Sequence, residues 1–284
     1  MAVNSLVALA IATLVFYILA GPFAVYISIR HGVSRSGPWY FMLLLVLVRI
    51  IGEPMTIATN GVLSSDGVSI GGYILGAIGL SPLLLMGGAL LQTVNTSLGK
   101  SNSAIDPRIL RLMGLVPLAA LIVSSIGSSN IYSSDPETRA TAQSERVAAT
   151  ALYLAYWGLL AFAIFSLYRA RGLLQEHRAH VFFVATVISM PFLLVRLLNQ
   201  CLTTFGSSQS QQANATNIWM RAFMASLMEF IVVIIYLIAG WLTVGDAKAA
   251  KAAKAAQGHY EETRGTSEEY RAQRPGQVTG MRAV

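Results

Sequence analysis

Charged residues are scarce in this sequence. Only 12% of its 284 residues are Asp, Glu, Lys or Arg, whereas 55% are hydrophobic. A soluble domain usually carries about 25% charged residues. So few charges cannot cover a folded surface of this size, and we therefore expect much of that surface to face lipid.

The residues that several membrane chemistries require are absent from the long apolar segments. A retinal protein needs a lysine in its last helix, haem and intramembrane zinc need histidine ligands, and an aspartyl protease needs two aspartates within the membrane. No phosphate loop of the Gly-x-x-x-x-Gly-Lys type is present either. We therefore expect no cofactor and no metal, and we disfavour an enzyme, although Glu229 could act as a base. All residues of the three types lie in predicted loops or the tail: Lys100, Lys248, Lys251, Lys254, His31, His177, His180, His259, Asp66, Asp106, Asp135 and Asp246.

Cysteine is nearly absent as well. Cys201 is the only one, so no intrachain disulfide can form. G-protein-coupled receptors usually have an outer disulfide and an Asp-Arg-Tyr-like triplet after the third helix. Here the corresponding residues are Thr96, Ser97 and Leu98. We also find no motif of the fungal lipid-translocating exporters, so both groups share only a helix count and orientation with this chain, and shape does not determine function.

Long apolar segments are abundant. A helix needs about 20 apolar residues to cross the hydrocarbon core. We predict an all-α bundle of seven such helices within a membrane domain of residues 1–245. Met1 to Ser5 contains no Lys or Arg, so we interpret the first segment as a retained helix rather than a signal peptide. The predicted spans are 6–28, 39–60, 71–95, 109–128, 147–168, 181–204 and 222–244, and the longest predicted loop is 129–146.

The cations indicate the orientation of the bundle. With seven spans, 15 Lys and Arg residues fall on the side of the C-terminal tail and 3 on the other side. Cytoplasmic loops carry the excess of positive charge, so we predict an outer N-terminus and a cytoplasmic tail. Asn214 then lies in an outer loop as a glycosylation sequon.

The net charge of +7 could suggest a nucleic-acid partner, but the cations lie in loops and in the last forty residues. That distribution is typical of contact with an anionic membrane face. Residues 246–284 form a basic tail that we expect to be largely disordered. Its Lys-Ala-Ala repeat places Lys248, Lys251 and Lys254 next to the membrane, where we expect them to bind anionic lipid.

Four ionisable residues lie within the predicted spans, where charges are costly and often functional. Arg49 and Glu53 are four residues apart on the second span, so they share a face and can pair. Arg196 is on the sixth span and Glu229 on the seventh, at depths similar to that of Glu53. We therefore predict one neutral polar cluster inside the outer half of the bundle.

The sixth span adds uncharged polar residues to this cluster. Asn199 and Gln200 follow Arg196 at helical spacing and form one stripe with it. Two interpretations remain open: the cluster is the floor of an outward-opening pocket, or it is an ion-pair network that only fixes the packing of the helices. The candidate ligand-binding residues are Arg49, Glu53, Arg196, Asn199, Gln200 and Glu229.

Short motifs at both ends of the chain resemble a known family. Arg30-His31-Gly32, Trp39 and Arg49-Ile50-Ile51-Gly52 resemble the start of a fungal family of seven-helix integral membrane proteins that carry a domain of unknown function. The likeness covers about residues 10–245 and leaves the tail out. It implies a multi-pass fungal membrane protein and supplies no reaction or ligand. The later part of the resemblance is carried by Met228-Glu229-Phe230, Tyr236 and Gly240.

The sequence therefore predicts a multi-pass protein of the plasma membrane or an endomembrane. We interpret it as a transporter or sensor for a small polar or amphipathic, lipid-like ligand. The alternative is a structural or adaptor membrane protein without a ligand pocket. We expect no nucleic-acid partner.

Overall fold

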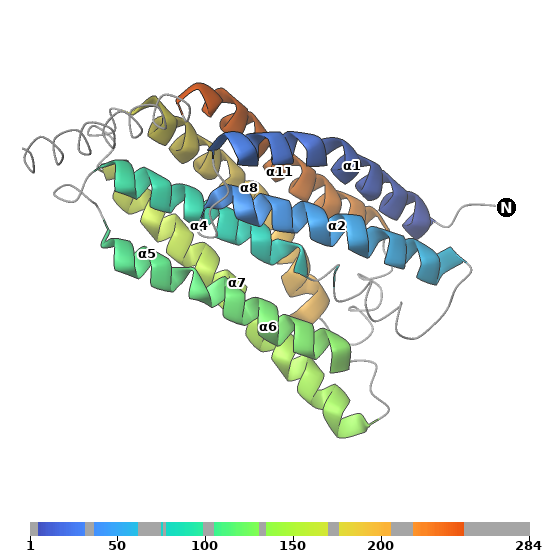
Figure 1. Cartoon of the computed structure of the whole chain (residues 1–284). Helices are drawn as coiled ribbons and strands as arrows, with labels where there is room; N and C mark the ends of the chain where they lie inside the picture. Colours follow the sequence, from blue (N-terminus) through green and yellow to red (C-terminus); the bar gives the residue numbers. More distant parts are fainter. Residues whose placement is uncertain are drawn as a thin grey trace, which may run out of the picture.

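The computed structural model describes residues 5–31, 37–61, 75, 78–98, 105–130, 135–169, 176–205 and 218–246, and this part of the chain forms helices without strands (Figure 1). Asn214, the lysines of the Lys-Ala-Ala repeat and the start of the predicted third span lie outside these residues. The elements are α1 (Ser5–His31), α2 (Pro38–Gly61), α4 (Leu80–Ser97), α5 (Pro107–Met113), α6 (Leu115–Asn130), α7 (Pro136–Arg169), α8 (His177–Phe205), α10 (Ile218–Met220), the π-helical segment η2 (Arg221–Leu227) and α11 (Met228–Leu242).

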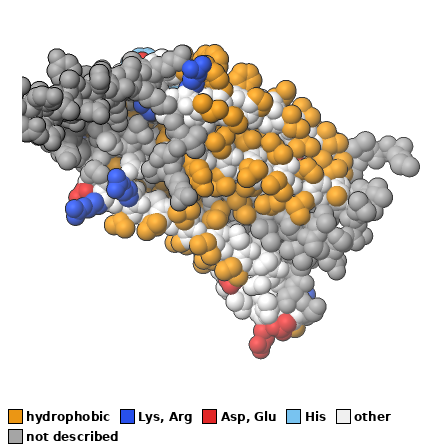
Figure 2. All heavy atoms as spheres, viewed as in Figure 1, with side chains coloured by type: hydrophobic (Ala, Val, Ile, Leu, Met, Phe, Trp, Pro, Cys, Tyr) orange, Lys and Arg blue, Asp and Glu red, His pale blue; other side chains and the backbone are white. Residues whose placement is uncertain are grey.

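Within the described residues, six helical segments are long and apolar enough to cross a membrane. Figure 2 shows hydrophobic side chains covering the middle of one face, with the visible charged side chains toward its ends. These exposed apolar side chains need a hydrocarbon solvent. The chain is therefore a multi-pass membrane protein. The six segments are Ser5–His31, Pro38–Ala58, Arg108–Asn130, Pro136–Arg169, His177–Phe205 and Arg221–Leu242.

Helix α4 is not among these six, and it lies inside the bundle. It packs against α2, α6, α7 and α8 (Figure 1). Thirteen of its 18 residues are buried, and Leu83, Leu84 and Leu90 are fully enclosed. With most of its surface against protein, α4 has little surface left that could face lipid.

The predicted loop 129–146 is wrong for most of its length, because α7 begins at Pro136. Asp135 accepts hydrogen bonds from the backbone amides of Glu137 and Thr138 and from the Thr138 hydroxyl. These bonds hold the pKa of the Asp135 carboxyl below its usual value. An Asp cap followed by proline starts a helix regardless of hydropathy, so α7 extends past its apolar run.

The predicted span 109–128 also differs in detail. It is interrupted at Gly114, which separates α5 from α6, and α6 continues to Asn130. Helices α6 and α7 pack along each other as a hairpin that diverges from α1, α2 and α11 at the end carrying Asn130 and Pro136 (Figure 1).

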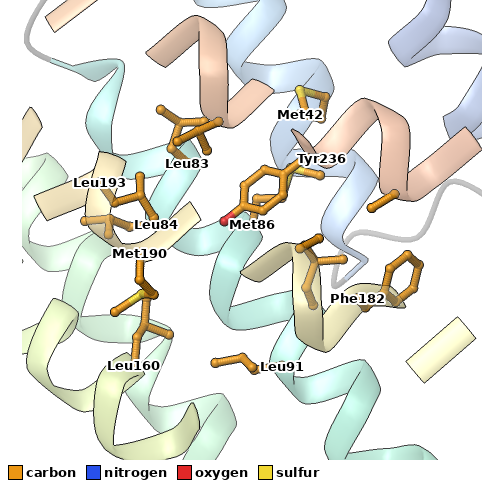
Figure 3. Packing of buried hydrophobic residues seen from close by; sticks show 14 of the residues in the cluster. Met42, Leu83, Leu84, Met86, Leu91, Leu160, Phe182, Met190, Leu193 and Tyr236 are labelled. Carbon is orange, nitrogen blue, oxygen red and sulfur yellow. The ribbon is translucent and has the colours of Figure 1, made fainter. Parts of the chain in front are cut away.

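Glycines and tyrosines shape the centre of the bundle. A Cβ atom added at Gly88 would overlap the Tyr156 hydroxyl of α7, and one added at Gly87 would lie 3.1 Å from the Tyr236 hydroxyl of α11. Small residues at these positions let the large rings of both neighbours reach α4. Figure 3 shows Tyr236 in this core beside Met86, with Leu84 close by.

Candidate functional site: a buried ion-pair cluster

Glu229 is the centre of the buried cluster. It lies in the first turn of α11 and is 1% exposed. Arg49 donates through Nε to its Oε1 atom at 2.6 Å and through Nη2 to its Oε2 atom. Arg196 Nη2 lies 2.7 Å from the same Oε2 atom, and the Tyr17 hydroxyl donates to Oε1. The carboxylate thus receives four donors from three helices, α1, α2 and α8, and is fully engaged.

Arg49 connects both carboxylates of the cluster. Besides its two bonds to Glu229, it donates through Nη1 to Glu53 Oε1 at 3.1 Å. Arg49 and Glu53 are one turn apart on α2, as their spacing predicts. The Glu53 side chain keeps 12% of its surface exposed, against 1% for Glu229. Glu53 is therefore the more accessible carboxylate.

Arg196 has a donor that remains unused. Its Nη1 atom donates to the backbone oxygen of Ala225 at 2.8 Å, and its Nη2 atom pairs with Glu229. Its Nε atom is buried and has no hydrogen-bond partner among the residues that the structure describes. A buried N–H without an acceptor costs free energy, so this donor is suited to an acceptor that arrives from outside.

Gly79 makes room for both guanidinium groups. A Cβ atom at this position would overlap Arg49 Nη2 and lie 3.2 Å from Arg196 Nη2. The backbone just before α4 thus approaches the two arginines so closely that a larger residue at this position would have to displace the Arg49 guanidinium. Sequence reasoning did not identify Gly79 as part of the site.

The segment η2 precedes Glu229 directly. Its hydrogen bonding departs from the α-helical pattern, and the carbonyl oxygen of Ala225 accepts from the Arg196 guanidinium as well as from the backbone amide of Met228. π-helical turns occur frequently at functional sites. Here the turn couples α8 to α11 beside the ion pairs.

Asn199 and Gln200 lie next to this cluster but outside its hydrogen bonds. Both are half-buried one turn from Arg196 on α8. Neither side chain forms a hydrogen bond to a residue within the described part of the chain. Thr203, which continues the stripe, donates instead to backbone carbonyls of its own helix. Of the six predicted site residues, the structure brings the four charged ones into direct contact.

Tyr17 is the cluster residue that sequence reasoning missed. Its ring is fully buried on α1, next to Phe16, which stacks on Phe230 of α11 at a centroid distance of 4.1 Å. The available signal was the small-residue face of α1, on which Ala10, Thr13, Ala20 and Ala24 surround Tyr17 at helical spacing. A lone large polar ring on such a face indicates a hydroxyl that reaches a partner on another helix.

The motif residues near the opposite end of α1 also meet. His31 ends α1 instead of lying in a loop, and its Nε2 atom is 3.0 Å from the Gly240 carbonyl oxygen of α11. Its ring lies 4.9 Å from that of Trp39 on α2. These contacts join motif residues from the two ends of the sequence. They give His31, Trp39 and Gly240, which lie outside the charged cluster, a role in packing.

The cluster has two cations and two anions, so it is formally neutral. Burying such charges is costly unless each finds partners, and these do so through five direct contacts. No group of three His, Cys, Asp or Glu residues in the described segments could hold a metal ion. The arrangement can fix helix positions, and its paired arginines can also bind a carboxylate or phosphate.

The fold and this site define a helical multi-pass membrane protein whose membrane-embedded charges meet in one buried cluster. The chain belongs to the family described as "Domain of unknown function (DUF7702)", and the match covers residues 3–245. No curated protein and no solved structure matches the chain.

Proposed function

We propose that the bundle has seven membrane spans, with α4 as the enclosed third one, an outer N-terminus and a cytoplasmic tail. Eighteen residues extend about 27 Å as a helix, close to the hydrocarbon thickness of about 30 Å. A crossing by α4 also leaves 15 cations on one side of the membrane and 3 on the other. The tail at 246–284, the seven spans and the fungal source implied by the resemblance remain predictions.

Single cysteines in a Cys201→Ser background test this topology. We expect a membrane-impermeant maleimide to label Asp66→Cys and Glu137→Cys on intact cells. Arg108→Cys and Glu176→Cys should react only after permeabilisation. If α4 does not cross, Arg108→Cys will react together with Asp66→Cys, and an inverted orientation will exchange the two pairs.

We further propose that the protein handles a small polar or amphipathic ligand as a transporter or sensor. The observation that carries this proposal is the buried Nε donor of Arg196, which has no partner in the described residues. The partly exposed Glu53 pairs with Arg49 in the same cluster, and the half-buried Asn199 and Gln200 lie one turn from Arg196 on α8. A ligand with an anionic head would satisfy this donor and compete with Glu229 for the arginines.

The ligand hypothesis is tested with a panel of fatty acids and lysophospholipids added to the purified protein. We expect at least one compound to raise Tm in the wild type, because binding to the folded state stabilises it. The double variant Asn199→Ala/Gln200→Ala should reduce that rise, since it removes polar groups beside Arg196. Thermal unfolding in detergent measures both.

Thr203→Ala is the matched control, because Thr203 belongs to the same stripe but bonds its own helix. It should respond like the wild type. The ligand site is refuted when no compound in the panel raises Tm, or when the double variant responds as strongly as the wild type.

A structural or adaptor role is the second candidate. It is favoured by Glu229 itself, which is 1% exposed and already has a full set of donors. In that case the cluster only fixes α1, α2, α8 and α11 relative to each other. Glu229→Gln would then lower the amount of folded protein without changing any response to the panel.

A further inference from the structure

A groove between α7 and α8 lies away from the ion-pair cluster. Its volume is about 410 Å³, and its walls are formed by side chains between Ala161 and Tyr168 on α7 and between His180 and Ile188 on α8. Seven of its nine lining residues are apolar, and Tyr168 and His180 are the other two. This volume lies within the range of small-molecule sites, about 300–1,000 Å³.

The two polar residues lie at the same end of the groove. The chain passes from α7 to α8 through a connection between Arg169 and His177, so Tyr168 and His180 both lie near that connection. From this end the groove follows α8 for eight residues, or about 12 Å. One leaflet of the hydrocarbon core is about 15 Å deep. The groove thus has the depth of one acyl chain.

A cation stands at the polar end. Arg169 ends α7, and its guanidinium lies 4.6 Å above the ring of Phe165, which lines the groove. Arg178 in the first turn of α8 is a second cation at this end, and the acids that the structure describes there are Glu176 and Asp246, which pairs with His177 at 3.0 Å. A guanidinium binds phosphate through paired N–H groups, and cations near the membrane surface attract anionic headgroups.

We propose that this groove binds an anionic phospholipid, with one acyl chain against Phe183, Val184 and Val187 and the phosphate near Arg169. Exchanging the acyl chain of one lipid for that of another changes the free energy of binding little, because both are equally apolar. The acyl chain therefore fixes the position of the lipid, and the headgroup provides the selectivity. The proposal requires that the chain spans the membrane and is independent of the ligand site at Glu229.

The test uses full-length protein in nanodiscs of phosphatidylcholine that contain a trace of phosphatidylserine with a photoreactive acyl chain. We expect crosslinks on Ile164–Tyr168 and Phe183–Ile188 by mass spectrometry. Arg169→Gln should lower labelling about fivefold, the contribution of one surface cation to anionic lipid binding. Val184→Phe should lower it similarly by filling the groove.

Matched controls are available on α1. Arg30 also stands over a ring in the last turn of its helix, 5.2 Å from the centroid of Tyr26, and Val25 is likewise an exposed valine. Arg30→Gln and Val25→Phe should leave groove labelling unchanged. Equal labelling by a phosphatidylcholine probe with the same chain, or undiminished labelling of Arg169→Gln, overturns the proposal. Size-exclusion profiles confirm that each variant is folded.

Discussion

Replacing Glu229 with alanine is expected to remove most of the folded protein from the membrane fraction. The substitution leaves Arg49 and Arg196 buried beside each other without the carboxylate that both contact. Breaking a buried ion pair by removing one partner costs about 3–5 kcal/mol. Such a loss is a large fraction of a typical free energy of unfolding, about 5–15 kcal/mol. The amount of monodisperse protein after size-exclusion chromatography measures the effect.

A double variant shows whether Glu229→Ala is destabilising because it leaves buried arginines unpaired or because it removes a large side chain. Glu229→Ala/Arg196→Ala has one fewer unpaired cation, and Arg49 keeps Glu53 as its partner. We therefore expect it to be more stable than Glu229→Ala alone, a clear departure from additivity. Glu137→Ala, at an exposed site in the first turn of α7, is the control for removing an acid. Strictly additive losses would contradict the ion-pair account.

Replacing Gly240 with alanine is expected to destabilise the bundle by about 1–3 kcal/mol, the usual cost of overfilling a packed core. The added Cβ would overlap the Trp39 ring and come within 2.8 Å of the Ile27 side chain. Trp39 is 2% exposed and Ile27 1%, so neither has space to move aside. The midpoint of unfolding in a denaturing detergent should shift accordingly.

Gly158 provides the matched control on α7. An added Cβ there meets no atom within 4 Å, because the residue faces outward from the bundle. Gly158→Ala should therefore leave stability unchanged or raise it slightly, since alanine favours a helix by about 1 kcal/mol over glycine. Equal losses in the two variants would mean that the Trp39 contact does not limit packing.

The outer helices could be predicted because lipid contact imposes a hydropathy signal. The apolar runs at 6–28, 39–60 and 181–204 lie within α1, α2 and α8. The same signal predicted a third span at 71–95, which overlaps α4 from Leu80 to Asn95, while the start of that span lies outside the described residues. The start of α7 was missed because polar residues outside the bilayer can extend a helix, and its Asp-Pro cap was the signal.

The charged part of the site could be predicted because hydrocarbon leaves buried charges few alternatives to pairing. Similar depth on three helices was sufficient to bring Arg49, Glu53, Arg196 and Glu229 together. Depth does not specify which uncharged groups complete the cluster. Tyr17 and Gly79 are defined by distances between helices, which no local pattern encodes.

The segment η2 also determines where the protein can tolerate the deletion of a residue. A π-helical turn contains one residue more than an α-helical turn requires, so a deletion within Arg221–Leu227 can restore regular α-helix and leave Glu229 oriented as before. The same deletion further along α11 would rotate Tyr236 and Gly240 by about 100° relative to Glu229. Relatives that differ in length are therefore expected to gain or lose residues before Met228, while the spacing from Glu229 to Gly240 stays constant.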